Sequence, residues 1–244
     1  MSLMEFANKL YLNSSRVYLE EWVRQAAQSV PAGSLVLDAG AGDCPYMPLF
    51  AGMRYESADF CQIDRSYGQI TYVCDLTDIP VEDNRFDLVL CSEVLTQIPE
   101  PKKVLQEFYR ILRPGVALWI SGNFYYTELN HSYDYYRYTS KGFRYLLEQS
   151  GFEIKQIEWL EGYYGTLAYQ LKTAAASLPI GSAVGNSGLI GILGSIPSLI
   201  LKPFFYLLSL YYGRLDTRVK VINRGHCKNY AIVAIKPADS QGAA

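Results

Sequence analysis

The fold class is decided by one stretch, Val36-Leu37-Asp38-Ala39-Gly40-Ala41-Gly42-Asp43. An apolar strand ends here in the acid Asp38 and turns sharply through two glycines. Glycine permits positive φ and lets a ligand approach the backbone closely, so the turn makes room for a nucleotide-like ligand at the carboxyl end of the strand. A dinucleotide-binding protein would place a third glycine where this chain has Cys44-Pro45, and Pro45 suits the first turn of a helix.

Short apolar segments and helical patterns alternate on both sides of this turn. Apolar residues at helical spacing predict helices over 13–30 and 102–112, and Thr139 is placed to cap another helix that Gly151 closes. Strands are expected at seven places: 35–38, 55–59, 70–74, 86–91, 116–121, 152–160 and 230–236. This alternation predicts an α/β fold with a mainly parallel sheet.

The composition limits the classes of partner. With 244 residues and 50% hydrophobic residues, the chain can bury the core of one α/β domain with an insertion. It has 22 Lys and Arg against 24 Asp and Glu, so no global positive field draws it to nucleic acid, and we expect no nucleic-acid partner. The five cysteines form no CxxC pair and indicate reduced thiols, without a metal site. The N-terminus lacks the apolar core of a signal peptide, so we expect a cytoplasmic protein.

Acids also end the next two predicted strands. Asp59 ends the second strand about 20 residues after the glycine turn, where nucleotide-binding folds place an acid that accepts hydrogen bonds from ribose hydroxyls. Asp75 ends the third strand and is followed by Leu76. Together with Asp38, these acids are expected on one edge of the sheet.

From Val36 to Phe152 the chain resembles class I S-adenosylmethionine-dependent methyltransferases, in particular the small-molecule and sugar branch. The segments that carry the resemblance occur in the family's order: 37–42, 74–76, 86–89 and 110–115. Gln97 stands where the family often has His, so the resemblance carries over no catalytic histidine. It implies a Rossmann-like three-layer sandwich, with a mainly parallel seven-stranded sheet whose last strand is antiparallel. The chain's own composition adds a hydrophobic helical insertion before that strand.

The resemblance also implies that S-adenosyl-L-methionine is the cofactor and assigns residues to it. The glycine turn approaches the methionine part, one acid holds the ribose, another faces the adenine, and Asp38 lies near the cofactor's amino group. The cofactor-binding residues expected in this way are Asp38, Gly40, Ala41, Gly42, Asp59, Asp75, Leu76 and Ser92.

Residues 123–139 form the candidate acceptor loop, because they follow the fifth strand at the same edge and are rich in tyrosine. Residues 131–139 resemble a segment of methyltransferases associated with glycan and cell-envelope biosynthesis. Tyr126, Asp134 and Arg137 are predicted to bind the acceptor, although Asp134 and Arg137 can instead pair to brace the loop. His131 and Glu128 are the candidates for a general base, and a plain hydrogen-bonding role for His131 stays open.

Residues 162–228 are expected to form the insertion, between a domain made of 35–161 with 229–238 and a helical segment over 1–34. Residues 173–213 carry a single charged side chain, Lys202, and prolines at 197 and 203 favour two short helices over one membrane span. Basic residues follow, as is typical of a segment that rests on an anionic membrane. Membrane contact through 188–212, a lid over the site and a dimer face remain alternatives, and the oligomeric state is open.

The sequence therefore predicts methyl transfer to a small-molecule, sugar or lipid-linked acceptor, in cell-envelope or glycan biosynthesis. A non-catalytic protein that binds S-adenosylmethionine and docks through its insertion is the alternative, and an acceptor loop folded away from the glycine turn would favour it. An enzyme that uses NAD or a nucleotide sugar is disfavoured by Cys44-Pro45 in the turn.

Overall fold

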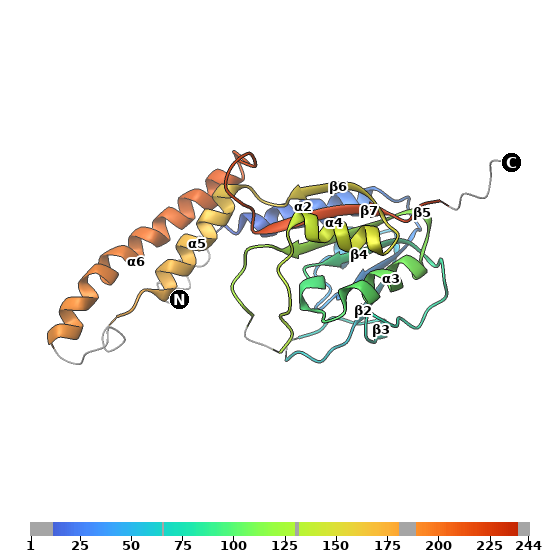
Figure 1. Ribbon diagram of the computed structural model, residues 1–244, viewed down its shortest axis with the longest axis horizontal. Helices are drawn as coiled ribbons and strands as arrows, with labels where there is room; N and C mark the ends of the chain where they lie inside the picture. Colours follow the sequence, from blue (N-terminus) through green and yellow to red (C-terminus); the bar gives the residue numbers. More distant parts are fainter. Residues whose placement is uncertain (1–11, 65, 130–131, 181–188, 239–244) are drawn as a thin grey trace. The chain divides into compact units, whose positions relative to one another are not determined.

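The structure is a computed structural model that describes residues 12–64, 66–129, 132–180 and 189–238 (Figure 1). By their contacts, these residues divide into two units. The sheet unit contains 19–160 and 229–238, and the helical unit contains 12–18 and 161–228.

The sheet unit is built on seven strands in the order β3-β2-β1-β4-β5-β7-β6. Their bounds are Leu35–Ala39 for β1, Arg54–Asp59 for β2, Tyr72–Val73 for β3, Phe86–Ser92 for β4, Leu112–Asn123 for β5, Glu153–Trp159 for β6 and Asn229–Ile235 for β7. Pairing is parallel from β3 through β5, and β7 is antiparallel to both of its neighbours. This confirms the predicted Rossmann-like sheet with its antiparallel last strand.

Helices cover both faces of the sheet (Figure 1). Successive side chains of a strand point to opposite faces, so β1 and β4, which are buried almost throughout, need cover on each side. On one face, α3 (Pro101–Ile111) and α4 (Ser140–Gln149) contribute Phe108 and Phe143 to the main apolar core. On the other face, Trp22 of α2 (Ser14–Gln28) packs against Trp119 of β5 with 5.2 Å between ring centroids. The predicted three-layer sandwich is therefore confirmed.

The helix ends follow the signals in the sequence. The Thr139 hydroxyl caps α4 by accepting from the Gly142 amide at 3.0 Å, and Gly151 follows the helix with φ of +89°. α3 ends at Ile111, and β5 begins at the next residue. The turn 113–115 therefore lies in an irregular start of β5 rather than between two elements, since pairing with β4 shifts there.

Two local predictions were wrong. The third strand is only Tyr72–Val73 rather than 70–74, because β3 pairs with β2 at just two positions. Pro45 does not open a helix: Cys44 has φ of +55°, a turn follows, and the next element is the 3-10 helix η1 (Met47–Phe50), which has its own proline at the N-terminus.

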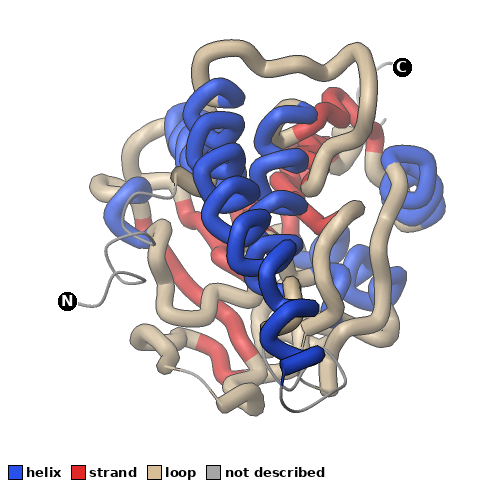
Figure 2. Tube along the Cα trace, turned by 90° about the vertical axis from the view of Figure 1, so that its left-hand side faces the viewer, coloured by secondary structure: helices blue, strands red, loops and turns tan. Residues whose placement is uncertain are grey.

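The helical unit contains α5 (Tyr163–Ser177) and α6 (Leu189–Asp216), which lie side by side (Figure 2). The prediction of two short helices was wrong, because α6 is one helix of 28 residues that includes Pro197 and Pro203. Both prolines are exposed, so their rings point away from the inner side of α6 and do not disturb its packing on α5. No helix among the described residues is long and apolar enough to cross a membrane.

Candidate functional site

The glycine turn after β1 leaves no room for a side chain. Gly40 has φ of +80°, and a Cβ built on it would lie 2.3 Å from Cγ2 of Val94. The Gly40 amide donates to the Ala58 carbonyl at 2.7 Å, which fixes the turn against the end of β2. Gly42 has φ of +59°. Only glycine satisfies both the positive φ and the close approach of Val94 at position 40.

Asp59, at the end of β2, holds the same turn from the other side. Its side chain is 2% exposed, and its two oxygens accept from the amides of Gly42 and Cys61, each at 3.0 Å. Asp59 therefore supports the glycine turn.

Asp38, in β1, is a buried acid with a phenol partner. Its side chain is 2% exposed, and Oδ2 accepts from the Tyr55 hydroxyl at 2.6 Å. Burial raises the pKa of Asp38 from 3.8 to about 7, although the Tyr55 hydrogen bond opposes the shift. Tyr55 is not among the site residues predicted from the sequence. The sequence did contain a signal for Tyr55. It lies four residues before Asp59 on the same predicted strand, so both side chains lie on one face of the sheet.

The other predicted cofactor residues lie at the ends of β3 and β4. Asp75 is exposed, and its Oδ1 accepts from the amide and hydroxyl of Thr77 at 2.9 and 2.8 Å, whereas Leu76 is buried. The Ser92 hydroxyl is half-buried and lies 3.4 Å from the hydroxyl of Ser121. Because the ends of parallel strands meet at one edge, the structure brings the predicted set to a single edge of the sheet.

Both ends of the acceptor loop are fixed to this edge. The Tyr138 amide donates to the Asn123 carbonyl at 3.1 Å, which closes the base of the loop. The amides of Tyr135 and Tyr136 both donate to the carbonyl of Thr96, which lies in the 3-10 helix η2 (Leu95–Gln97). The loop therefore rests on the segment that follows β4.

The loop then reaches the end of β2. The ring of Tyr133 packs edge-on against Phe60, with 5.1 Å between centroids, and its hydroxyl donates to Gln62 at 3.4 Å. Phe60 directly follows Asp59, so the loop crosses the edge of the sheet from β5 to β2, past β4 and β1. An acceptor loop folded away from the glycine turn, which would have favoured the non-catalytic alternative, is not what the structure has.

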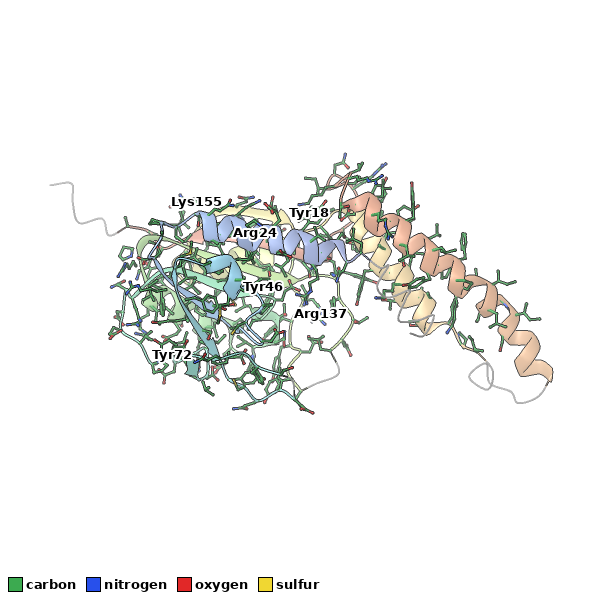
Figure 3. The ribbon with its side chains drawn as sticks, turned by 180° about the vertical axis from the view of Figure 1, so that it is seen from behind. Tyr18, Arg24, Tyr46, Tyr72, Arg137 and Lys155 are labelled. Atoms are coloured by element: carbon green, nitrogen blue, oxygen red, sulfur yellow. The ribbon has the colours of Figure 1, made fainter. Side chains whose placement is uncertain are left out.

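Asp134 and Arg137 form the bracing pair that the sequence left open. Arg137 donates to both carboxylate oxygens of Asp134, at 2.6 and 2.9 Å, and reaches the carbonyls of Tyr126 and Thr127 (Figure 3). The Leu129 amide donates to Asp134 at 2.7 Å. These bonds hold the two sides of the loop together, and acceptor binding by Tyr126, Asp134 and Arg137 stays a prediction.

Of the two candidate general bases, the structure describes only Glu128. Glu128 is exposed on the loop. His131 lies outside the described residues, so its role also stays a prediction. Sequence reasoning missed the contact of Tyr55 with Asp38, the close approach of Val94 to Gly40, and the contact of Phe60 with Tyr133 of the acceptor loop. The tyrosine-rich composition of the loop was the signal for the aromatic contact.

The sheet order, the glycine turn and the acids at one edge define the class: the sheet unit is a methyltransferase domain with the class I fold. Residues 37–120 match the family described as "Methyltransferase domain", to which this segment belongs.

Curated relatives match this same domain. Probable tRNA methyltransferase 9B of Mus musculus is 30% identical over 105 residues, which are 40% of this chain and 24% of that protein. Ubiquinone biosynthesis O-methyltransferase of Coxiella burnetii is 28% identical over 78 residues, 32% of this chain and 31% of that protein. The chain thus matches only 24% to 31% of the length of these relatives.

Solved structures share the fold over most of the chain. Phosphoethanolamine N-methyltransferase 2 of Haemonchus contortus, in complex with S-adenosyl-L-methionine, has a TM-score of 0.50 at 18% identity, covering 88% of this chain and 52% of that one. A proposed sarcosine dimethylglycine methyltransferase from Galdieria sulphuraria has a TM-score of 0.56 at 15% identity, covering 91% and 86%. At these identities the likeness shows the fold alone.

Proposed function

We propose that the protein transfers a methyl group from S-adenosylmethionine to a hydroxyl of a small molecule, a class that includes sugars and lipid-linked sugars. One observation carries the proposal: the tyrosine-rich loop 123–139 crosses the edge of the sheet at which the glycine turn and the buried acids lie. Aromatic rings with hydroxyl groups suit a hydroxylated ring, which they can stack on and hydrogen-bond.

The residues at this edge fit the cofactor. Val94 occupies the space that a Cβ on Gly40 would need, so position 40 of the turn accepts only glycine. Asp59 would accept from ribose hydroxyls, and Asp38 would face the cofactor's amino group. When bound, S-adenosylmethionine supplies a methyl group on a sulfonium, which a lone pair of the acceptor attacks in line.

The residues of this chain contribute to the reaction mainly by positioning the acceptor. The loop contacts of Tyr133 and the Asp134–Arg137 pair hold the acceptor side of the site in place. A hydroxyl acceptor also needs a base for its proton, and Glu128 or His131 would take this role. A neutral amine carries its own lone pair and would need no such base, so the amine arm of the acceptor panel separates the two kinds of acceptor.

The test is transfer of radiolabelled methyl from S-adenosylmethionine to a panel of acceptors, with cofactor binding measured in parallel by calorimetry. The panel contains phenols, free sugars and lipid-linked sugars, with amines as a separate arm. Labelling of a hydroxyl compound supports the proposal. Cofactor binding without transfer to any member would favour the non-catalytic alternative, and labelling of amines alone would overturn the hydroxyl assignment.

Transfer RNA belongs in the same panel, because a relative with 30% identity is named as a tRNA methyltransferase. The composition argues for the small-molecule interpretation, since 22 Lys and Arg against 24 Asp and Glu give no global positive field that would attract phosphates. Labelling of tRNA in preference to every small hydroxyl compound would contradict the proposal.

A further inference from the structure

The outer side of α6 is a continuous apolar stripe. Its side chains are between 46% and 65% exposed: Ile196, Leu199, Ile200, Phe204, Leu207 and Tyr211. They recur every three or four residues, which places them on one side of the helix. Such a row of large exposed apolar side chains marks a surface that binds something.

The inner side of α6 has the opposite character. Apart from Asp216 at its end, the buried positions that the structure describes on α6 are small, namely Ser195, Ser198, Ser209 and Gly213. α5 runs alongside the helix (Figures 1 and 2), and Tyr212 stacks on Tyr164 of α5. Helices of water-soluble proteins normally bury their large apolar side chains and expose their small polar ones. Small residues between helices and large apolar residues outside are the pattern of helices in contact with lipid.

The exposed charges of the described helical unit are all positive. Its two acids, Glu161 and Asp216, are 0% exposed. Oδ2 of Asp216 accepts from the Gly162 amide at 3.2 Å, and Glu161 accepts from the Lys228 amide, so both acids are held within this unit. The exposed basic residues are Arg16, Arg214, Arg218, Lys220 and Arg224.

The basic residues continue the apolar stripe. Arg214 follows Tyr211 by three residues and Leu207 by seven, so it lies on the same side of α6 and at the end of the stripe. Arg218 and Lys220 follow directly after the helix. A surface that pairs an apolar row with basic residues at one end is complementary to a bilayer whose headgroups are negative.

We propose that the helical unit binds the surface of an anionic lipid bilayer, with the α6 stripe at the acyl boundary and the basic residues from Arg214 onward among the headgroups. RNA fits less well, because it would leave six large apolar side chains without an apolar partner. A second copy of the chain fits less well too, because the basic residues of the two copies would then face each other and repel. The proposal does not depend on methyl transfer.

The test is sedimentation of the full chain with vesicles of phosphatidylcholine, with or without phosphatidylglycerol. Wild type should bind the anionic vesicles, and salt should weaken binding only in part because the apolar contact is not screened. L199Q with L207Q should lower partition about tenfold or more. R214Q with R218Q should lower partition to anionic vesicles about tenfold and leave weak binding to neutral vesicles unchanged.

Matched controls are V73Q and Y145Q, which replace equally exposed apolar residues of the sheet unit and should leave vesicle binding unchanged. Calorimetric binding of S-adenosylmethionine and far-UV circular dichroism establish that each variant is folded. An equal loss of vesicle binding in V73Q and in L199Q/L207Q would overturn the proposal. The proposal would also be overturned if wild type did not bind anionic vesicles at low salt. In that case, a dimer that L199Q/L207Q dissociates would identify a second copy as the partner, and tRNA binding through Arg214 and Arg218 would identify RNA.

Discussion

The Tyr55 hydroxyl donates a 2.6 Å hydrogen bond to Oδ2 of Asp38, in a place from which water is almost excluded. A hydrogen bond to the charged form normally lowers the pKa of a carboxyl. Here burial outweighs it, and the pKa of Asp38 rises to about 7. An acid at the cofactor edge therefore changes its charge near neutral pH.

Asp38→Asn should stabilise the protein at pH 8 and leave stability nearly unchanged at pH 4. Between pH 4 and 7 the unfolded chain loses the Asp38 proton while the folded chain keeps it, so wild-type stability falls as pH rises, by about 1.4 kcal/mol per pH unit. The variant lacks this loss and keeps an acceptor for Tyr55. Thermal melts at three pH values measure the difference. D43N, which removes an exposed acid of the same turn, should show none of it.

Binding of S-adenosylmethionine below pH 7 should release a proton from Asp38. A cationic amino group beside the carboxyl favours its charged form and lowers its pKa. Calorimetry at pH 6 in two buffers of different ionisation enthalpy measures the release, which should vanish in D38N and persist in D43N. An equal heat in both buffers for wild type would place the amino group away from Asp38.

Asp59→Ala should weaken cofactor binding and also lower the melting temperature. The structure gives Asp59 two tasks, because its carboxylate accepts from the amides of Gly42 and Cys61 besides facing the predicted ribose site. Lost charge-assisted bonds correspond to about 1.5–3 kcal/mol of binding free energy. D59N keeps one acceptor oxygen and should recover part of the melting temperature. D78N, an exposed acid nearby, is the control, and unchanged affinity in folded D59N would remove Asp59 from the site.

Tyr133→Ala should raise the KM for the acceptor and leave the affinity for S-adenosylmethionine unchanged. The ring contact with Phe60 is the point at which the loop reaches β2, and such aromatic pairs contribute about 0.5–1.5 kcal/mol. The alanine variant should also be cleaved faster by trypsin after Arg137. Y133F keeps the ring and should behave as wild type in both assays; if Y133F fails as badly as Y133A, the hydroxyl matters rather than the ring contact.

Arg137 and Asp134 can be separated by a double-mutant cycle. R137A leaves the Asp134 carboxylate, 7% exposed, without its main partner; Arg137 is 25% exposed, so the cost should fall below the value of about 3–5 kcal/mol for a fully buried pair. D134A with R137A should cost less than the sum of the single variants, because no unpaired charge remains. Thermal unfolding measures this coupling. If the double variant keeps its melting temperature but loses acceptor affinity, Arg137 or Asp134 contacts the acceptor as well as bracing the loop.

The sequence predicted the sheet well because its signals are local. Each strand is an apolar segment, and the acids at 38, 59 and 75 stand where those segments end. The cap at Thr139 and the positive φ of Gly151 depend on neighbouring residues only. The class of the domain followed from the same motifs, spread in order along the chain.

What the sequence did not predict depends on residues far apart in the chain. Tyr133 and Phe60 are separated by more than 70 residues, and no local pattern says that the loop crosses the sheet edge to meet Phe60. The prolines at 197 and 203 fit the rule that proline breaks helices, but packing against α5 outweighs it. The sequence left two roles open for Asp134 and Arg137, which were acceptor binding and pairing with each other. Only the structure shows that they pair.

The two outermost strands of the sheet have a consequence for self-association. β3 offers only two residues at one edge, and β6 at the other edge has a register shift at Ile154/Gln156 with charged Glu153 and Lys155 beside it (Figure 3). Short, irregular and charged edges give an incoming strand little to pair with. Fibrils or dimers built by extending this sheet should therefore not form when the protein is concentrated, and its aggregation should depend on detergent or lipid rather than on strand exchange.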